Sequence, residues 1–127
     1  MDIDVVMKEI IYDIRGFVVI CHIGGKQSFL LFTKKGYCRG GDLHDEEQLF
    51  VILKGKIKFT IKESGIEREL ILMEKDTYKV KPKYPHMLSA LEDCVVLEIS
   101  LGDKERNTSL YAPYRSIVES KNKEMRS

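Results

Sequence analysis

Hydrophobic residues from position 17 to position 101 come in short runs, most of them alternating with polar residues, and turn-forming residues separate one run from the next. An alternation with period two is typical of a β-strand that buries one face, and helical periodicity is nearly absent from this part of the chain. The runs are also rich in β-branched and aromatic residues, which favour strands. The pattern predicts seven strands, at residues 17–23, 28–33, 48–53, 56–62, 68–73, 77–82 and 94–101.

The run at 56–62 shows the alternation most clearly. Ile57, Phe59 and Ile61 fall on one face of an extended chain, and lysines and a threonine fall on the other. We therefore expect this strand to cover a core with one face and to meet water with the other. Seven or more strands in so short a stretch predict an all-β fold, either a sandwich or a barrel.

Turn residues between the runs indicate how the strands are joined. Residues 24–25 and 54–56 suit tight hairpins, because glycine reaches positive φ without steric cost, and residues 63–65 close a third connection. Beyond position 102 the chain becomes polar, and residues 114–127 are expected to form a terminal helix.

The chain has 127 residues and a mass of 14.7 kDa, with 43% hydrophobic and 32% charged residues. This size and composition support one domain with a core and argue against disorder. The expected organisation is a single domain over residues 1–127, with a barrel core at about 15–102 and a C-terminal tail at 103–127.

Charge and targeting patterns exclude several classes of protein. The 21 Lys and Arg nearly cancel the 20 Asp and Glu, so no overall field draws the chain to nucleic acid or to an anionic membrane. No apolar stretch approaches the roughly 20 residues of a transmembrane helix, and the acidic N-terminus is unlike a secretory signal. Cys21, Cys38 and Cys94 are odd in number and far apart, which predicts free thiols. We therefore expect a cytoplasmic protein.

Two of the three histidines have surroundings that suggest chemistry. Asp42 and His44 lie two residues apart, so they project to the same face of an extended segment, and a strand that carries His86 is expected to meet them across a barrel. Two histidines and a carboxylate form the facial arrangement that holds ferrous iron and related metals. Gln48 is expected to add a neutral oxygen ligand or a hydrogen bond.

The spacing around these residues resembles that of the cupins. In the first cupin motif a His-x-His pair is followed by Glu and then Gly, and here the matching positions are Asp42, His44, Gln48 and Gly55. In the second motif a Gly-Asp turn leads to Pro and then His, and here the matching positions are Asp76, Pro82, Pro85 and His86. The resemblance spans about residues 36–101 and implies a single antiparallel cupin (jelly-roll) β-barrel with a short helical tail.

The chain departs from the cupin pattern at several positions. Asp42 stands in place of the first histidine and Gln48 in place of the glutamate, so that His44 and His86 alone match the usual metal ligands. Lys75 and Lys83 replace glycines, and Ala90 replaces an asparagine.

A narrower resemblance is to RmlC-like cupins that act on nucleotide-linked 4-keto sugars without a metal, the dTDP-sugar 3,4-ketoisomerases and dTDP-4-dehydrorhamnose 3,5-epimerases. It rests on residues 13–16, Arg39-Gly40 and the glutamine at 48. It implies an isomerase or epimerase that needs no cofactor, because a histidine suits proton removal beside a carbonyl. The implied catalytic residues are His44 and Asp42, and the implied substrate-binding residues are Arg39, Tyr37, Gln48, Tyr84 and His86.

Two other functions remain open. In a metal-dependent cupin, Asp42, His44 and His86, assisted by Gln48, would hold a divalent ion such as Fe, Mn, Zn or Ni. In a non-catalytic cupin, the barrel would bind a small ligand without turnover. Purely structural roles also remain, such as a surface ion pair for Arg39. The lysines at 75, 79, 81 and 83 alternate with other residues, which favours a solvated strand face over a phosphate site.

The apolar run at 28–33 bears on assembly, because such a strand needs cover. Small cupins resemble one another in pairing through edge strands, and closed pairs of identical chains are the commonest oligomers. We therefore expect a homodimer whose partner, beyond the second copy, is a small-molecule substrate.

Overall fold

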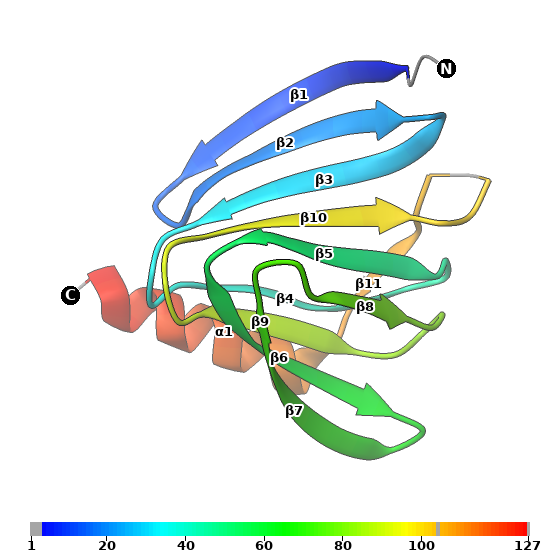
Figure 1. The fold of residues 1–127 in the computed structure, drawn as a ribbon. Helices are drawn as coiled ribbons and strands as arrows, with labels where there is room; N and C mark the ends of the chain where they lie inside the picture. The colour runs from blue at the N-terminus through cyan, green and yellow to red at the C-terminus, as the bar shows by residue number, and fades with distance from the viewer. Residues whose placement is uncertain (1–3, 104, 127) are drawn as a thin grey trace.

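The computed structural model of the protein describes residues 4–103 and 105–126. Within these residues the chain forms two antiparallel sheets and one helix (Figure 1). The first sheet contains, in spatial order, β1 (Val5–Asp13), β2 (Gly16–Ile23), β3 (Lys26–Thr33), β10 (Cys94–Ser100), β5 (Gln48–Lys54) and β8 (Thr77–Val80). The second contains β11 (Thr108–Leu110), β4 (Cys38–His44), β9 (His86–Ala90), β6 (Lys56–Glu63) and β7 (Ile66–Met73), and the helix is α1 (Ala112–Arg126).

The all-β prediction is confirmed, since each of the seven predicted strands is present. The pattern does not predict β4, because glycines and polar residues interrupt it, nor the short strands β9 and β11. It also misses β1, a strand whose residues are all exposed. The sheets therefore extend beyond the expected core at 15–102 on both sides. The terminal helix is confirmed and begins at Ala112, two residues before the predicted start.

One predicted hairpin is wrong. The glycines at 24–25 do join β2 to β3, and residues 63–65 join β6 to β7. Residues 54–56, however, join β5 to β6, which belong to different sheets. Gly55 has a φ of 85°, and a Cβ there would lie 2.3 Å from the Asp93 carbonyl oxygen, so glycine lets the chain cross between the sheets at close range.

The core lies between the two sheets. Ile57, Phe59 and Ile61 of β6 are fully buried, as their alternation predicts, and pack with Phe50 and Val96 from the opposite sheet. All three cysteines are buried free thiols. The lysines at 75, 79, 81 and 83 are exposed, which confirms a solvated face.

Helix α1 packs on the outer side of β4. Asn122 bonds the backbone of Cys38 in both directions, accepting from its N–H at 2.7 Å and donating to its carbonyl at 3.0 Å. A Cβ on Gly41 would lie 2.7 Å from the Arg115 Cα, so the glycine allows the helix to approach the strand. In the part of the chain that the structure describes, no helix has the length and apolar character needed to cross a membrane.

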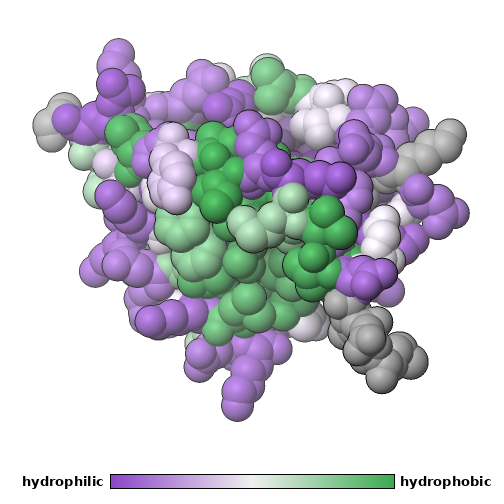
Figure 2. Space-filling view, turned by 90° about the horizontal axis from the view of Figure 1, so that it is seen from above, coloured by the Kyte–Doolittle hydropathy of each residue, from purple (hydrophilic) through white to green (hydrophobic). Residues whose placement is uncertain are grey.

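The outer face of the first sheet is apolar across five strands. Strand alternation turns Phe29 and Val96 toward the core and leaves Leu30 and Leu97 half-buried on the outside. Seen from the side of β1, hydrophobic residues gather in one area among hydrophilic ones (Figure 2). The five strands are about 4.8 Å apart and about seven residues long, so the area of this face is about 550 Å². This area is close to the roughly 600 Å² that each subunit buries in a small stable interface. The outward residues of β1, β2, β3, β10 and β5 are Ile10, Tyr12, Phe17, Val19, Leu30, Phe32, Val95, Leu97, Ile99, Leu49 and Val51.

We propose that a second copy of the chain covers this face, which would make the protein the homodimer expected from its sequence. A carboxylate in the middle of the face loses its hydration when it is buried, so Leu97→Asp should weaken the dimer at least about tenfold. Multi-angle light scattering across a dilution series measures this change. The matched control, Ile71→Asp, changes an exposed residue on β7 and should leave the mass unchanged. A monomeric parent chain at micromolar concentration would contradict the proposal.

Candidate functional site

Four side chains from three strands meet between the sheets. Asp42 and His44 come from β4, His86 begins β9, and Glu98 comes from β10 in the opposite sheet. Asp42 pairs with His86 in the β4–β9 ladder. Asp42, His44 and His86 do meet, since one ligand atom from each lies within 4.8 Å of the others. His86 reaches them from the neighbouring strand of the same sheet, however, and not across the barrel.

The distances within this group are those expected around a small metal ion. His44 Nε2 lies 3.5 Å from Asp42 Oδ1 and 3.7 Å from Glu98 Oε2. His86 Nε2 lies 3.6 Å and 3.9 Å from the same two oxygens. Ligands about 2.1 Å from a tetrahedral ion lie about 3.4 Å from one another. The imidazole-to-carboxylate distances are close to this value, and the ligand atoms of Asp42, His44 and His86 all lie within 4.8 Å of one another.

Hydrogen bonds at Nδ1 hold each imidazole with its Nε2 facing the group. His86 Nδ1 donates to the Tyr84 carbonyl at 2.9 Å, and its Nε2 faces the two carboxylates. His44 Nδ1 contacts the Thr108 hydroxyl at 2.9 Å, and its Nε2 accepts from Arg106 at 3.3 Å, a bond that a metal ion bound at this nitrogen would replace. Such outer bonds are the usual way in which proteins fix histidine ligands.

Burial decides the protonation states of the group. Burial, followed by the nearby cations Arg106 and His86, lowers the pKa of His44 to about 2. This histidine is therefore neutral at physiological pH, the form that ligates metals. Burial also raises the pKa of Asp42, against the attraction of His86. A cation in the group would favour the ionised form of this carboxylate.

The sequence analysis does not identify Glu98, a member of the group, or Arg106, which contacts it. Glu98 is 4% exposed, and its other oxygen accepts a 2.6 Å bond from Arg106. Arg106 also stacks on the Phe29 ring, 3.7 Å from its centroid. The sequence could have indicated Glu98, because it is the one charged residue in the otherwise apolar strand at 94–100. Arg106 lies in a polar connection whose sequence gives no such signal.

A β-bulge adds Arg39 to the same side of β4. The β4–β9 register shifts between Gly40 and Asp42, so that Arg39 and Asp42, three residues apart, both face inward. Gly40 has a φ of 94° and Gly41 a φ of 83°, conformations that side chains resist. The structure thereby excludes the surface ion pair for Arg39, which is 5% exposed and lines a cavity of about 190 Å³ with Asp42, His86 and Glu98.

The other predicted site residues are less directly connected to this group. Gln48 is fully buried and donates to the Glu46 carbonyl and the Ser100 hydroxyl, and its Oε1 has no partner among the described residues. The Tyr84 hydroxyl bonds Ser64, and neither tyrosine, at 37 or 84, is among the described residues that line the cavity. The binding roles of Gln48, Tyr37 and Tyr84 stay predictions.

Comparisons with known proteins support the fold. No protein-family model and no curated protein sequence matches the chain. Among solved structures, Bacillus subtilis oxalate decarboxylase, described with Mn(II) centres, aligns with a TM-score of 0.73 at 21% identity, over 84% of this chain and 31% of that one. The chain thus spans about a third of that relative. This likeness confirms that the chain has the cupin jelly-roll fold that its motifs imply.

Two further structures extend the comparison. The capsular polysaccharide assembling protein CapF from Staphylococcus aureus aligns with a TM-score of 0.61 at 17% identity, over 76% of this chain and 28% of that one. Fe(II)-HppE aligns with a TM-score of 0.58 at 12% identity, over 73% of this chain and 55% of that one. Two of the three proteins are thus described with a divalent metal.

Proposed function

We propose that the protein is a metal-dependent enzyme in which Asp42, His44, His86 and Glu98 hold one divalent ion of the iron or manganese type. The observation that carries the proposal is the arrangement of two imidazole nitrogens and two carboxylate oxygens at 3.5–3.9 Å. Imidazole and carboxylate ligands together suit Fe, Mn and Zn, and the similar structures of oxalate decarboxylase and HppE are described with Mn(II) and Fe(II).

The surrounding residues prepare the group for this role. The Tyr84 carbonyl and the Thr108 hydroxyl hold the two imidazoles with their Nε2 atoms facing inward. Arg106 binds one oxygen of Glu98 and leaves the other facing the histidines. A bound divalent ion would supply a Lewis acid that polarises an oxygen of the substrate. The phenylalanines at 29, 50 and 59 line the same cavity and limit the water that enters it.

The side chains that meet in the site favour a metal-dependent function over the keto-sugar isomerase that the narrower resemblance implies. The keto-sugar isomerase is the second candidate, supported by the 3.5 Å contact of Asp42 with His44 and by the likeness to CapF. A general base works best with a pKa near neutrality, whereas burial lowers the pKa of His44 to about 2. The same neutral imidazole is the form that a metal requires, so the metal-dependent function is placed first.

Metal analysis of untagged protein, purified without chelator and reloaded anaerobically with Fe(II) or Mn(II), tests the proposal. We expect about one tightly bound ion per chain, and an increase in the melting temperature when the metal is added. Failure to retain any of Fe(II), Mn(II), Zn(II) or Ni(II) after gel filtration would overturn it. For the isomerase, the corresponding result is deuterium uptake from solvent into a nucleotide-linked keto sugar by metal-free protein. Sugar binding without such exchange would indicate a non-catalytic cupin.

A further inference from the structure

The cavity beside the candidate metal group contains a buried cation without a carboxylate partner. Among the described residues, three arginines that line the cavity are each paired with an acid: Arg15 with Asp13, Arg106 with Glu98 and Arg115 with Glu119. Arg39 forms no such pair, although its side chain is buried. Buried charges in proteins are usually paired, so this guanidinium is unusual.

The hydrogen bonds of Arg39 leave much of its guanidinium unused. Its Nε donates to the Thr33 hydroxyl at 2.6 Å, and its Nη2 donates to the Phe32 carbonyl at 2.9 Å. A guanidinium has five N–H donors, and no described residue accepts from the other three. Burial and the neighbouring Arg15 lower the pKa of Arg39 to about 10, so it still carries its charge at neutral pH. Two bonds fix the side chain, and its remaining donors are free to bind a ligand.

A charge count for the cavity points to an anion. With the three arginine–acid pairs neutral, the charges that remain are those of Arg39 and of an ionised Asp42. A divalent ion would then give the cavity a net charge of +2. Because unbalanced charge is costly in a partly apolar cavity, a ligand with one or two negative charges would complete it. The metal and the anion would each strengthen the binding of the other.

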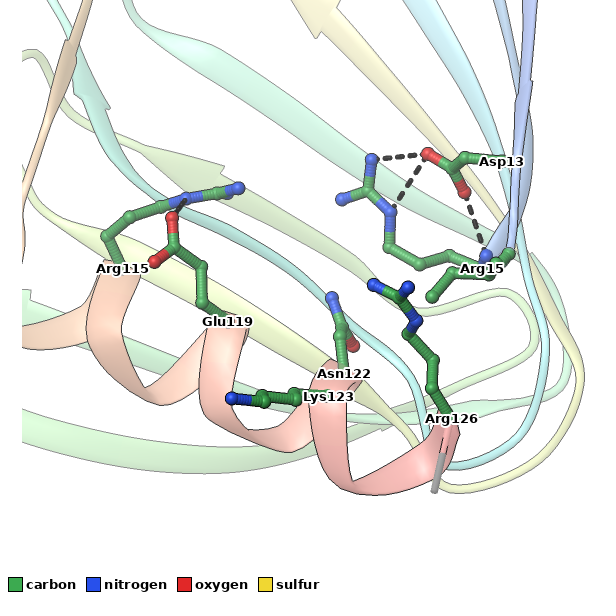
Figure 3. A pocket seen from close by; sticks show the side chains of 8 residues that line it. Asp13, Arg15, Arg115, Glu119, Asn122, Lys123 and Arg126 are labelled. Atoms are coloured by element: carbon green, nitrogen blue, oxygen red, sulfur yellow. Dashed lines mark hydrogen bonds and ion pairs between the residues drawn. The ribbon is translucent and has the colours of Figure 1, made fainter.

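An open cationic cleft lies beside this cavity. It has a volume of about 630 Å³ and lies between α1 and the turn that joins β1 to β2 (Figure 3). Arg15 and Arg115 line both the cleft and the inner cavity, so the two lie next to each other. Lys123 and Arg126 also line the cleft, and no described carboxylate pairs with either. The surface next to the cavity therefore attracts anions.

We propose that Arg39 binds the carboxylate of a small organic acid, the substrate class of this protein, with the acid's other end directed to the metal group. The inference rests on the proposed function for the role of the metal, whereas the anion site rests on Arg39 itself. A cavity of about 190 Å³ takes a molecule of a few carbon atoms. The free edge of a guanidinium matches the two oxygens of a carboxylate.

Malonate binding to the Mn(II)-loaded chain, followed by isothermal titration calorimetry, tests the proposal. We expect saturable binding of malonate, weaker binding of inorganic phosphate, and a loss of at least about tenfold in malonate affinity in Arg39→Met, because a bond between charged groups is lost. Arg68→Met is the matched control, since Arg68 lies on β7 and pairs with Glu63 outside the cavity. Its malonate affinity should equal that of the parent chain.

A second variant keeps the test valid if Arg39→Met does not fold. Arg39→Lys retains the charge without the paired donors, and should also bind malonate several-fold more weakly at unchanged Mn(II) content. Equal malonate affinity in the parent chain and a folded Arg39 variant would overturn the anion site, as would phosphate binding more tightly than malonate. If the chain takes up no metal, the proposed function fails. Malonate binding to the metal-free chain that is lost in the Arg39 variants would still support the anion site.

Discussion

Replacement of His86 by leucine should lower the affinity of the protein for Mn(II) or Fe(II) by at least about a hundredfold. His86 would supply one of two nitrogen ligands, and even the residues that orient a ligand typically contribute 10- to 100-fold to affinity. Leucine has a similar volume, and the site is apolar on one side, where the Phe50 and Phe59 rings lie 5.4 Å and 5.9 Å from the imidazole. Metal titration with a competing chelator measures the change.

The chain offers a matched control for this substitution. His22 lies on β2 of the other sheet, is half-buried and is not part of the candidate metal group. The His22→Leu variant should bind metal with the affinity of the parent chain. If the His86→Leu variant and the parent chain bind metal with equal affinity, and both have native circular dichroism, then His86 is not a ligand of the metal.

The Glu98→Gln variant should bind Mn(II) about 10- to 100-fold more weakly than the parent chain. The amide keeps the shape of the side chain but removes the charge that faces His44 and His86 at 3.7 Å and 3.9 Å. It also leaves Arg106, whose guanidinium bonds Glu98 at 2.6 Å, without its counter-charge close to the metal. A buried pair that loses one member costs about 3–5 kcal/mol, so we also expect a lower melting temperature without metal.

Two comparisons separate the ligand role of Glu98 from a general effect of charge. Glu69→Gln on the exposed face of β7 should change neither metal affinity nor melting temperature. Gln48→Leu tests the ligand position implied by the cupin motif. If Gln48→Leu weakens metal binding more than Glu98→Gln does, the fourth ligand is at position 48 and the role assigned to Glu98 is wrong.

The motif spacing predicts part of the site. Asp42 and His44 alternate on one strand, and the second motif places His86 where a jelly-roll barrel brings it opposite them. Glu98 and Arg106 come from segments that no motif includes, and they reach the group because β10 lies in the opposite sheet and the chain after it returns over the site. The inward position of Arg39 depends on a bulge, which shifts the alternation by one residue.

The sequence by itself determined the β class, most of the strands, the terminal helix and the three residues of the candidate metal group. It did so because alternation and motif spacing are local properties of the chain. The tertiary structure decided that residues 54–56 cross between sheets, that Glu98 faces the histidines and that Arg39 is buried without an acid. These features depend on which strands pack face to face, and such contacts between distant residues are set by the burial of the whole core.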